Sequence, residues 1–178
     1  MSRYNLRTMS ALCQLHEDID ARVQAIRGSR PDWLCCKECD NCCRRLADVP
    51  QLSGAEWALL REGLEMLPRE RLQTISQDIS NLAGSKSRPI VCPLLDQPTG
   101  ACMVYAQRPV ACRTYGFYVQ RELGLYCQDI ESRVADGTLA DVVWGSHDSI
   151  DHRLGGLGET LTLTKWFELW ENERQWKL

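Results

Sequence analysis

The chain has 178 residues, and a scale of roughly 150 residues per domain predicts one domain that can bury a sizeable core. Its composition, 44% hydrophobic and 25% charged, is typical of a folded globular protein and excludes wholesale disorder, collagen and a coiled coil. The net charge of -3 argues against nucleic acid as a partner, because binding to phosphates needs an excess of positive charge.

The N-terminal segment lacks the continuous apolar stretch of a signal peptide or a membrane span. Ten cysteines in a chain without such a signal favour a reducing location. In that setting, closely spaced thiols are metal ligands or redox groups more often than disulfides. We therefore expect a cytoplasmic protein with no membrane partner.

The first predicted element is an amphipathic helix over residues 5–27, where apolar residues recur at intervals of three and four. Gly28 is placed to end it. The segment from Cys35 to Cys43 follows, with five cysteines in nine residues and neither helical nor strand periodicity. This pattern is typical of a metal-binding loop.

Two further helices are predicted between the cysteine-rich regions. Ser53 and Glu56 have the spacing of a capping box, and the apolar stripe behind them indicates a helix as far as Leu67. Pro68 is expected to start the second helix, and Gly84 to end it in the left-handed conformation. The two helices are predicted to form a hairpin.

The second half of the chain contains shorter predicted elements. Residues 90–95 and 101–105 flank a turn that contains Gly100, which predicts one short β-hairpin. Pro109 is suited to the first turn of a helix that carries Cys112. The remainder, up to the last segment, indicates short helices between glycine breaks.

A C-terminal aromatic helix is predicted at about residues 162–175. We expect its aromatic stripe to dock on the core, with a partner-binding face as the alternative. The aromatic residues concerned are Trp166, Phe167, Trp170 and Trp176. Together these elements predict a mainly α fold, a small single domain over residues 1–178 with one short β-hairpin, stapled by a cysteine-ligated metal or cluster.

The cysteine-rich segment contains the motif CxxCxxCC, in which a short loop can turn successive sulfurs toward one ion or cluster. Its first three cysteines have the spacing of bacterial ferredoxin ligands, whose fourth cysteine precedes a proline. Cys92 also precedes a proline, although it lies much further along the chain than the ferredoxin spacing would place it.

Together with Cys92-Pro93-Leu94-Leu95, Gly100-Ala101-Cys102-Met103-Val104-Tyr105 and Arg108-Pro109-Val110-Ala111-Cys112-Arg113, this motif resembles the YkgJ or CxxCxxCC family, described as zinc- or iron-chelating domains. The resemblance spans residues 36 to about 115, within a family-like core expected at about 33–127. It implies eight metal-ligating cysteines. These map onto Cys36, Cys39, Cys42, Cys43, Cys92, Cys102, Cys112 and Cys127. Cys13 and Cys35 lie outside the pattern, although Cys35 can compete with Cys36 or Cys43 for a coordination position.

Eight thiols are enough for two four-cysteine sites, each able to hold zinc or an iron-sulfur cluster of the 4Fe-4S type, although fewer centres would also use them. The ferredoxin-like run and the lack of a histidine within the cluster favour iron-sulfur over zinc. Thiolate sites are anionic and need positive groups nearby. The candidates beside the cysteines are Arg44, Arg45, Arg108 and Arg113, with a solvated surface role as the alternative.

The sequence therefore predicts a cytoplasmic metal-binding protein with a redox, sensing or carrier role. The alternatives are a structural zinc module that serves a protein partner, and an iron-sulfur enzyme. Cys36 and Cys39 form a CxxC pair, but the region lacks the βαβ context of a dithiol oxidoreductase. No catalytic residue can be assigned from the residue order.

Overall fold

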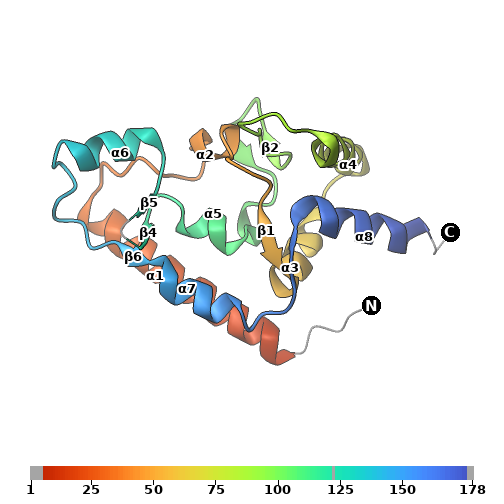
Figure 1. The fold of residues 1–178 in the computed structure, drawn as a ribbon, viewed down its shortest axis with the longest axis horizontal. Coiled ribbons are helices and arrows are strands. Elements are labelled where there is room, and N and C mark those ends of the chain that lie inside the picture. Colours follow the sequence, from red (N-terminus) through yellow and green to blue (C-terminus); the bar gives the residue numbers. More distant parts are fainter. Residues whose placement is uncertain (1–5, 122, 176–178) are drawn as a thin grey trace.

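A computed structural model describes residues 6–121 and 123–175, and it confirms a mainly helical, small single domain (Figure 1). The helices in chain order are α1 (Leu6–Ser29), α2 (Asn41–Arg44), α3 (Gly54–Glu65), α4 (Arg69–Gly84), the 3-10 helix η1 (Tyr105–Gln107), α5 (Val110–Thr114), α6 (Gln128–Ala135), α7 (His147–Leu154) and α8 (Leu163–Gln175). The strands are β1 (Gln51–Ser53), β2 (Leu95–Asp96), β3 (Ala101–Cys102), β4 (Tyr118–Gln120), β5 (Leu123–Leu125), β6 (Gly145–Ser146) and β7 (Thr160–Thr162).

The predicted helical hairpin is present as α3 and α4, and its start follows the sequence closely. Ser53 is the N-cap of α3, and its hydroxyl accepts a hydrogen bond from the Glu56 backbone N–H. In return the Glu56 carboxylate accepts from the Ser53 backbone N–H at 2.8 Å, which completes the capping box. Pro68 is the N-cap of α4.

The end of α4 differs from the prediction in one respect. The helix ends at Gly84, but this glycine is not in the left-handed conformation. The chain instead leaves through Ser85 in an extended conformation, while the Ser85 N–H still donates to the carbonyl of Leu82. A positive φ is therefore not needed at this exit. The N-terminal helix also differs slightly, since α1 continues through Gly28 to Ser29.

The predicted β-hairpin is confirmed as the antiparallel pair β2 and β3, in which Leu95 lies opposite Cys102. Gly100 closes the turn with a φ of 70°. The structure adds two strand groups that the sequence did not indicate. Strands β1 and β7 pair antiparallel, and β4 pairs with both β5 and β6. Because β1 leads into α3 and β7 leads into α8, their pairing brings the starts of these helices together.

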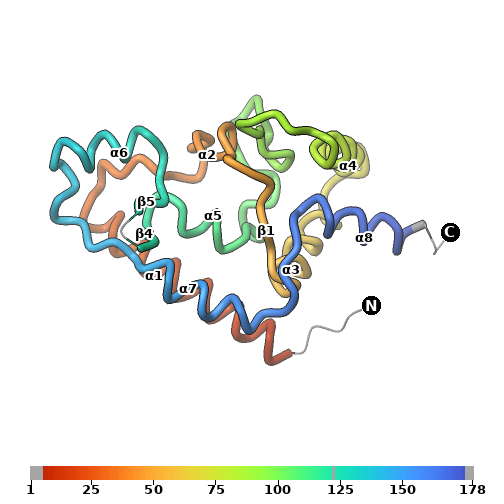
Figure 2. Tube along the Cα trace, in the orientation of Figure 1, coloured from red at the N-terminus to blue at the C-terminus, as the bar shows by residue number. Residues whose placement is uncertain are grey.

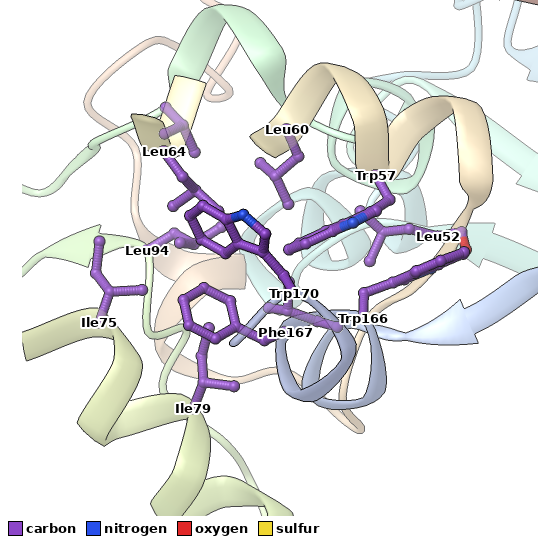
Figure 3. Packing of buried hydrophobic residues seen from close by; sticks show 12 residues of the cluster. Leu52, Trp57, Leu60, Leu64, Ile75, Ile79, Leu94, Trp166, Phe167 and Trp170 are labelled. Atoms are coloured by element: carbon purple, nitrogen blue, oxygen red, sulfur yellow. The ribbon is translucent and has the colours of Figure 1, made fainter. Parts of the chain in front are cut away.

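The first hydrophobic cluster packs α8 against α3 and α4 around stacked aromatic rings (Figure 3). Trp57 of α3 stacks on Trp166 with ring centroids 6.0 Å apart, and Phe167 meets Trp170 edge to face at 5.2 Å. The Trp166 indole N–H donates to the carbonyl of Leu52 at 2.9 Å. The predicted docking of the aromatic stripe is therefore confirmed for Trp166, Phe167 and Trp170, all of which are buried. Trp176 lies outside the described residues.

The second hydrophobic cluster is built on α1, which lies alongside α7 (Figure 2). Leu12, Leu15 and Ile19 of α1 are fully buried in it, together with Ile150 of α7 and Val110 of α5. The α1 to α7 contact also carries an ion pair between Arg153 and Asp18 at the surface. These contacts explain why the apolar stripe predicted for the N-terminal helix faces inward.

The cysteine-rich segments lie at the junction of the two clusters. Cys92 and Cys102 pack against the first cluster, whereas Cys35 packs against the second. Figure 1 shows α2 and α5 between the group formed by α3, α4 and α8 and the group formed by α6 and β4–β6. Among the described helices, none combines the length and apolar character needed to cross a membrane.

Candidate metal centre

The cysteines gather around two cavities with a common wall. The inner cavity has a volume of about 60 Å³, and its non-cysteine walls are mostly apolar. Its cysteines are Cys36, Cys39, Cys42, Cys43, Cys92, Cys102 and Cys112. The second space, which we call the thiol cleft, has a volume of about 440 Å³. Its cysteines are Cys35, Cys36, Cys39, Cys42, Cys112 and Cys127.

The two lists share four cysteines, so the spaces are neighbours. Every cysteine in the predicted eight lines one cavity or both. The structure thus brings the proximal and distal cysteines together in one part of the fold. Cys13 is exposed on α1 and lines neither cavity.

The short helix α2 presents the last two cysteines of the motif. Cys42 and Cys43 both lie on it, and their sulfurs are 3.9 Å apart. The turn before α2 is closed by a hydrogen bond from the Cys39 N–H to the Cys36 carbonyl at 3.3 Å. The predicted loop is therefore compact, and its four cysteines all line the inner cavity, while Cys36, Cys39 and Cys42 also line the thiol cleft.

Backbone hydrogen bonds join the motif to the distal cysteines. The Cys92 N–H donates to the Cys43 carbonyl at 2.7 Å, and Leu46 forms an antiparallel bridge with Ile90. Cys102 is added to the same wall because β3 pairs with β2. These contacts bring segments about fifty residues apart in the chain into register.

Helix α5 carries Cys112 and is positioned by a buried carboxylate. One oxygen of Glu56 accepts a hydrogen bond from the Val110 backbone N–H at 2.8 Å, in the first turn of α5. The other oxygen accepts from Ser53 at the start of α3. A single side chain therefore caps both helices and sets where Cys112 lies relative to α3.

Cys35 is a candidate that the family pattern leaves out. A Cβ atom placed on Gly116, whose φ is 87°, would lie 2.3 Å from the Cys35 sulfur. The Arg27 guanidinium donates to the Cys35 carbonyl at 2.7 Å, which fixes this residue from the other side. Cys35 is less exposed than Cys36, its neighbour in the motif. The adjacent cysteine pair was the only sequence signal for it, because the space beside Gly116 is visible only in the fold.

Burial and neighbouring thiols raise the pKa of several of these cysteines. Burial raises the pKa of Cys35 to about 12, with further contributions from Cys39 and Cys127. Burial likewise raises the pKa of Cys112 to about 12. The hydrogen bond with Cys43 raises the pKa of Cys42 well above its usual range, and burial adds to this. Without a metal, these thiols are neutral at pH 7.

The Cys43 thiol and the Tyr115 phenol show how closely the titratable groups interact. The hydrogen bond with Cys42 lowers the pKa of Cys43, but a hydrogen bond with Cys92 and burial outweigh it, so the pKa is about 12. Burial, followed by the charges of Cys42 and Cys127, raises the pKa of the Tyr115 phenol to about 12. The cavities thus disfavour additional negative charge unless a cation balances it.

Of the four arginines predicted to support the centre, only Arg108 and Arg113 line a cavity, and these two have different surroundings. Arg113 donates to both carboxylate oxygens of Asp20, at 3.1 and 3.2 Å, and to the carbonyls of Arg108 and Ala106. Arg108 lies over the Tyr105 ring at 3.5 Å from its centroid and donates through Nε to the Tyr105 carbonyl. Arg108 lines both cavities, and Arg113 lines the thiol cleft.

The donor set suits a soft metal. Among the described residues that line the inner cavity there is no histidine and no carboxylate, so the ligands offered there are thiols. Zinc and iron-sulfur clusters both accept four thiolates. The thiols do not form a finished coordination shell. Within residues 6–121 and 123–175, no three cysteine, histidine or acidic side chains are grouped tightly enough to hold a metal ion.

Comparison with known families identifies the chain as a member of one of them. The profile of the CxxCxxCC family, described as "Putative zinc- or iron-chelating domain", matches residues 35–132. This range begins at Cys35 and extends past Cys127, so it includes the cysteines around both cavities. No curated protein and no solved structure matches the chain.

Proposed function

Because the chain belongs to the CxxCxxCC family of zinc- or iron-chelating domains, we propose that it binds its metal through the cysteines around the inner cavity and the thiol cleft. The observation that carries this proposal is the gathering of all eight predicted cysteines around two adjoining cavities. All ten cysteines of the chain are free thiols, so none of these ligands is already used in a disulfide.

The arrangement favours two sets of four ligands. Cys43, Cys92 and Cys102 line only the inner cavity, and we add Cys112, which lines both cavities and whose thiol pKa is raised by burial and then by Cys102, Cys42 and Cys43. These four form the inner set. The outer set is Cys36, Cys39, Cys42 and Cys127, because the first three share the loop and Cys127 lines the cleft. Cys35 is the competitor of Cys36 for the outer set.

We further propose that the bound group is an iron-sulfur cluster of the 4Fe-4S type, one or two per chain, in a cytoplasmic protein that forms a single domain over residues 1–178. The ferredoxin-like spacing supports iron-sulfur over zinc, and the lack of a histidine among the described residues that line the inner cavity argues against a zinc site with mixed cysteine and histidine ligands. When bound, such a cluster supplies one-electron transfer, which fits a redox, sensing or carrier role. Arg108 places a positive charge beside both ligand sets.

The ligands are expected to lose protons as the metal binds, because the raised pKa values keep the free thiols neutral at pH 7. Metal binding must also draw the sulfurs closer together. The position of the cysteines between the two hydrophobic clusters implies that this closure tightens the junction. Structural thiolate sites contribute on the order of 10 kcal/mol of apparent binding energy to folding.

The test is elemental analysis of the full chain purified without oxygen and without added metal. Iron with matching acid-labile sulfide, at about four or eight per chain, is the expected result. Zinc at about one or two per chain without sulfide would replace the cluster with a structural zinc module for a protein partner. Folded protein that contains no metal would overturn the proposal.

Four variants, one of them a control, locate the ligands. Cys39→Ala should lose metal from the outer set and make both cysteine regions more sensitive to proteolysis. Cys13→Ala is the matched control, since Cys13 lines neither cavity, and it should retain the full metal content. Cys35→Ala and Cys36→Ala, compared side by side, identify which of the two competes successfully for the outer set.

A further inference from the structure

The thiol cleft is larger than metal ligation requires. Its volume of about 440 Å³ lies within the range of small-molecule sites, which is roughly 300–1,000 Å³. It is lined by cysteines and by residues from the last turns of α1, including Val23 and Arg27. A molecule in this cleft would therefore lie directly against the proposed outer ligand set.

Positively charged side chains outnumber negatively charged ones in the thiol cleft. Three arginines line it, and Asp20 is the one carboxylate among the described lining residues. Asp20 is already engaged, because both of its oxygens accept hydrogen bonds from Arg113. The guanidinium groups of Arg27 and Arg108 have no carboxylate partner in the described parts of the chain.

The Arg108 guanidinium is fixed in one orientation by its neighbours. Its Nε donates to the Tyr105 carbonyl at 3.0 Å, and its guanidinium lies 3.5 Å from the centroid of the Tyr105 ring. Arg113 fixes the backbone of the same residue by donating to the Arg108 carbonyl at 3.1 Å. The two terminal nitrogens of Arg108 meet no acceptor among the described residues. A guanidinium fork that is stacked and oriented in this way suits an oxyanion with two oxygens.

We propose that the thiol cleft binds a small carboxylate molecule whose charged end is received by the terminal nitrogens of Arg108. The inference rests on the proposed function, because the bound molecule would lie beside the outer metal centre. Arg108 lines both cavities, so the carboxylate would be placed at the common wall of the thiols rather than at the outer rim. The proposal thus adds a class of small-molecule ligand, which metal binding by the cysteines does not imply.

The test is calorimetric titration of the metal-containing full chain with succinate at low ionic strength, with succinamide as the uncharged counterpart and inorganic phosphate as a second oxyanion. We expect succinate to bind with a Kd below about 1 mM and succinamide not to bind. Binding of phosphate in preference to succinate would overturn the assignment to carboxylates. Failure of succinate to bind at concentrations up to about 10 mM would overturn the proposal as a whole.

Three variants test the role of Arg108. Arg108→Gln should weaken succinate binding at least about tenfold, and Arg108→Lys should weaken it several-fold because an ammonium lacks the planar fork. Arg45→Gln is the matched control. It removes the same charge next to the cysteine motif, but Arg45 lines neither cavity, so affinity should stay within about twofold.

Metal content is measured on every variant to separate the two proposals. If Arg108→Gln keeps its metal and loses succinate binding, the guanidinium binds the carboxylate. If it instead loses its metal, Arg108 serves the metal centre and the present inference is wrong. If the wild-type chain contains no metal but still binds succinate through Arg108, the metal proposal fails while the carboxylate site stands.

Discussion

The carboxylate of Glu56 offers the sharpest test of how the fold positions the metal ligands. Its side chain is buried and accepts hydrogen bonds from the backbone N–H groups of Ser53 and Val110, both at 2.8 Å, and from the Ser53 hydroxyl at 2.7 Å. Glu56→Ala leaves two backbone donors without a partner in a buried site. Each such donor costs about 1–3 kcal/mol, so the expected loss of unfolding free energy is about 4 kcal/mol.

The assay is urea unfolding followed by far-ultraviolet circular dichroism, with metal retention measured against a chelator. Glu56→Gln retains an acceptor for the Val110 N–H but presents an amide NH2 group to the Ser53 N–H. Its free energy of unfolding should therefore fall by about 2 kcal/mol, half the loss expected for Glu56→Ala. Glu62→Ala, an exposed position on the same helix, should stay within about 0.5 kcal/mol.

The same variants address the metal centre because Glu56 caps the helix that carries Cys112. Glu56→Ala should release metal to the chelator faster than wild type, whereas Glu62→Ala should not. A Glu56→Ala protein within about 1 kcal/mol of wild type would refute the capping argument. A strongly destabilised protein with unchanged metal release would show that α5 does not depend on this carboxylate for its position.

Three further outcomes are expected from the same unfolding assay. Gly116→Ala places a Cβ against the Cys35 sulfur at a positive φ and should lower the free energy of unfolding by about 2 kcal/mol. Gly28→Ala, which has open space around it, should cause no loss, and equal effects of the two variants would contradict the close packing. Phe167→Ala should cost about 3–5 kcal/mol because this ring is fully buried, and a loss below 1 kcal/mol would contradict the packing of α8. Burial, followed by the charge of Arg113, lowers the pKa of His16 to about 4. The neutral imidazole therefore contributes about 3 kcal/mol to the free energy of unfolding above pH 6.5, and this contribution is lost as the pH falls toward 4. His16→Gln should remove this part of the pH dependence, and an unchanged pH profile would contradict it.

The helices could be predicted from the sequence because their signals are local. The capping box at Ser53, the proline at 68 and the apolar stripes each lie within a few residues of the element that they specify. Nothing of this kind marks the added strands. Strand β1 pairs with β7, more than one hundred residues away, and each has only three residues, too few for an alternating pattern.

The candidate site was predicted in part for the same reason. The regular spacing of the cysteines and the family resemblance indicated eight thiols, and these line the two cavities. Cys35 was predicted only as a competitor for a coordination position, because its close approach to Gly116, eighty-one positions later, is not visible in the sequence. The difference between Arg108 and Arg113 was also invisible, because it depends on whether a carboxylate of α1 lies within reach of each guanidinium.

The two cavities imply different access to any centre that the cysteines hold. The inner cavity is small, and buried leucine and valine side chains line it beside the cysteines, so a centre held by Cys43, Cys92 and Cys102 would be partly screened from water. The thiol cleft is several times larger, and the exposed Cys36 lies where the cleft adjoins the inner cavity. A centre there could meet a ligand or a redox partner directly. Because both ligand sets are thiols, the difference in function between them would come from access and neighbouring charge rather than from the choice of metal.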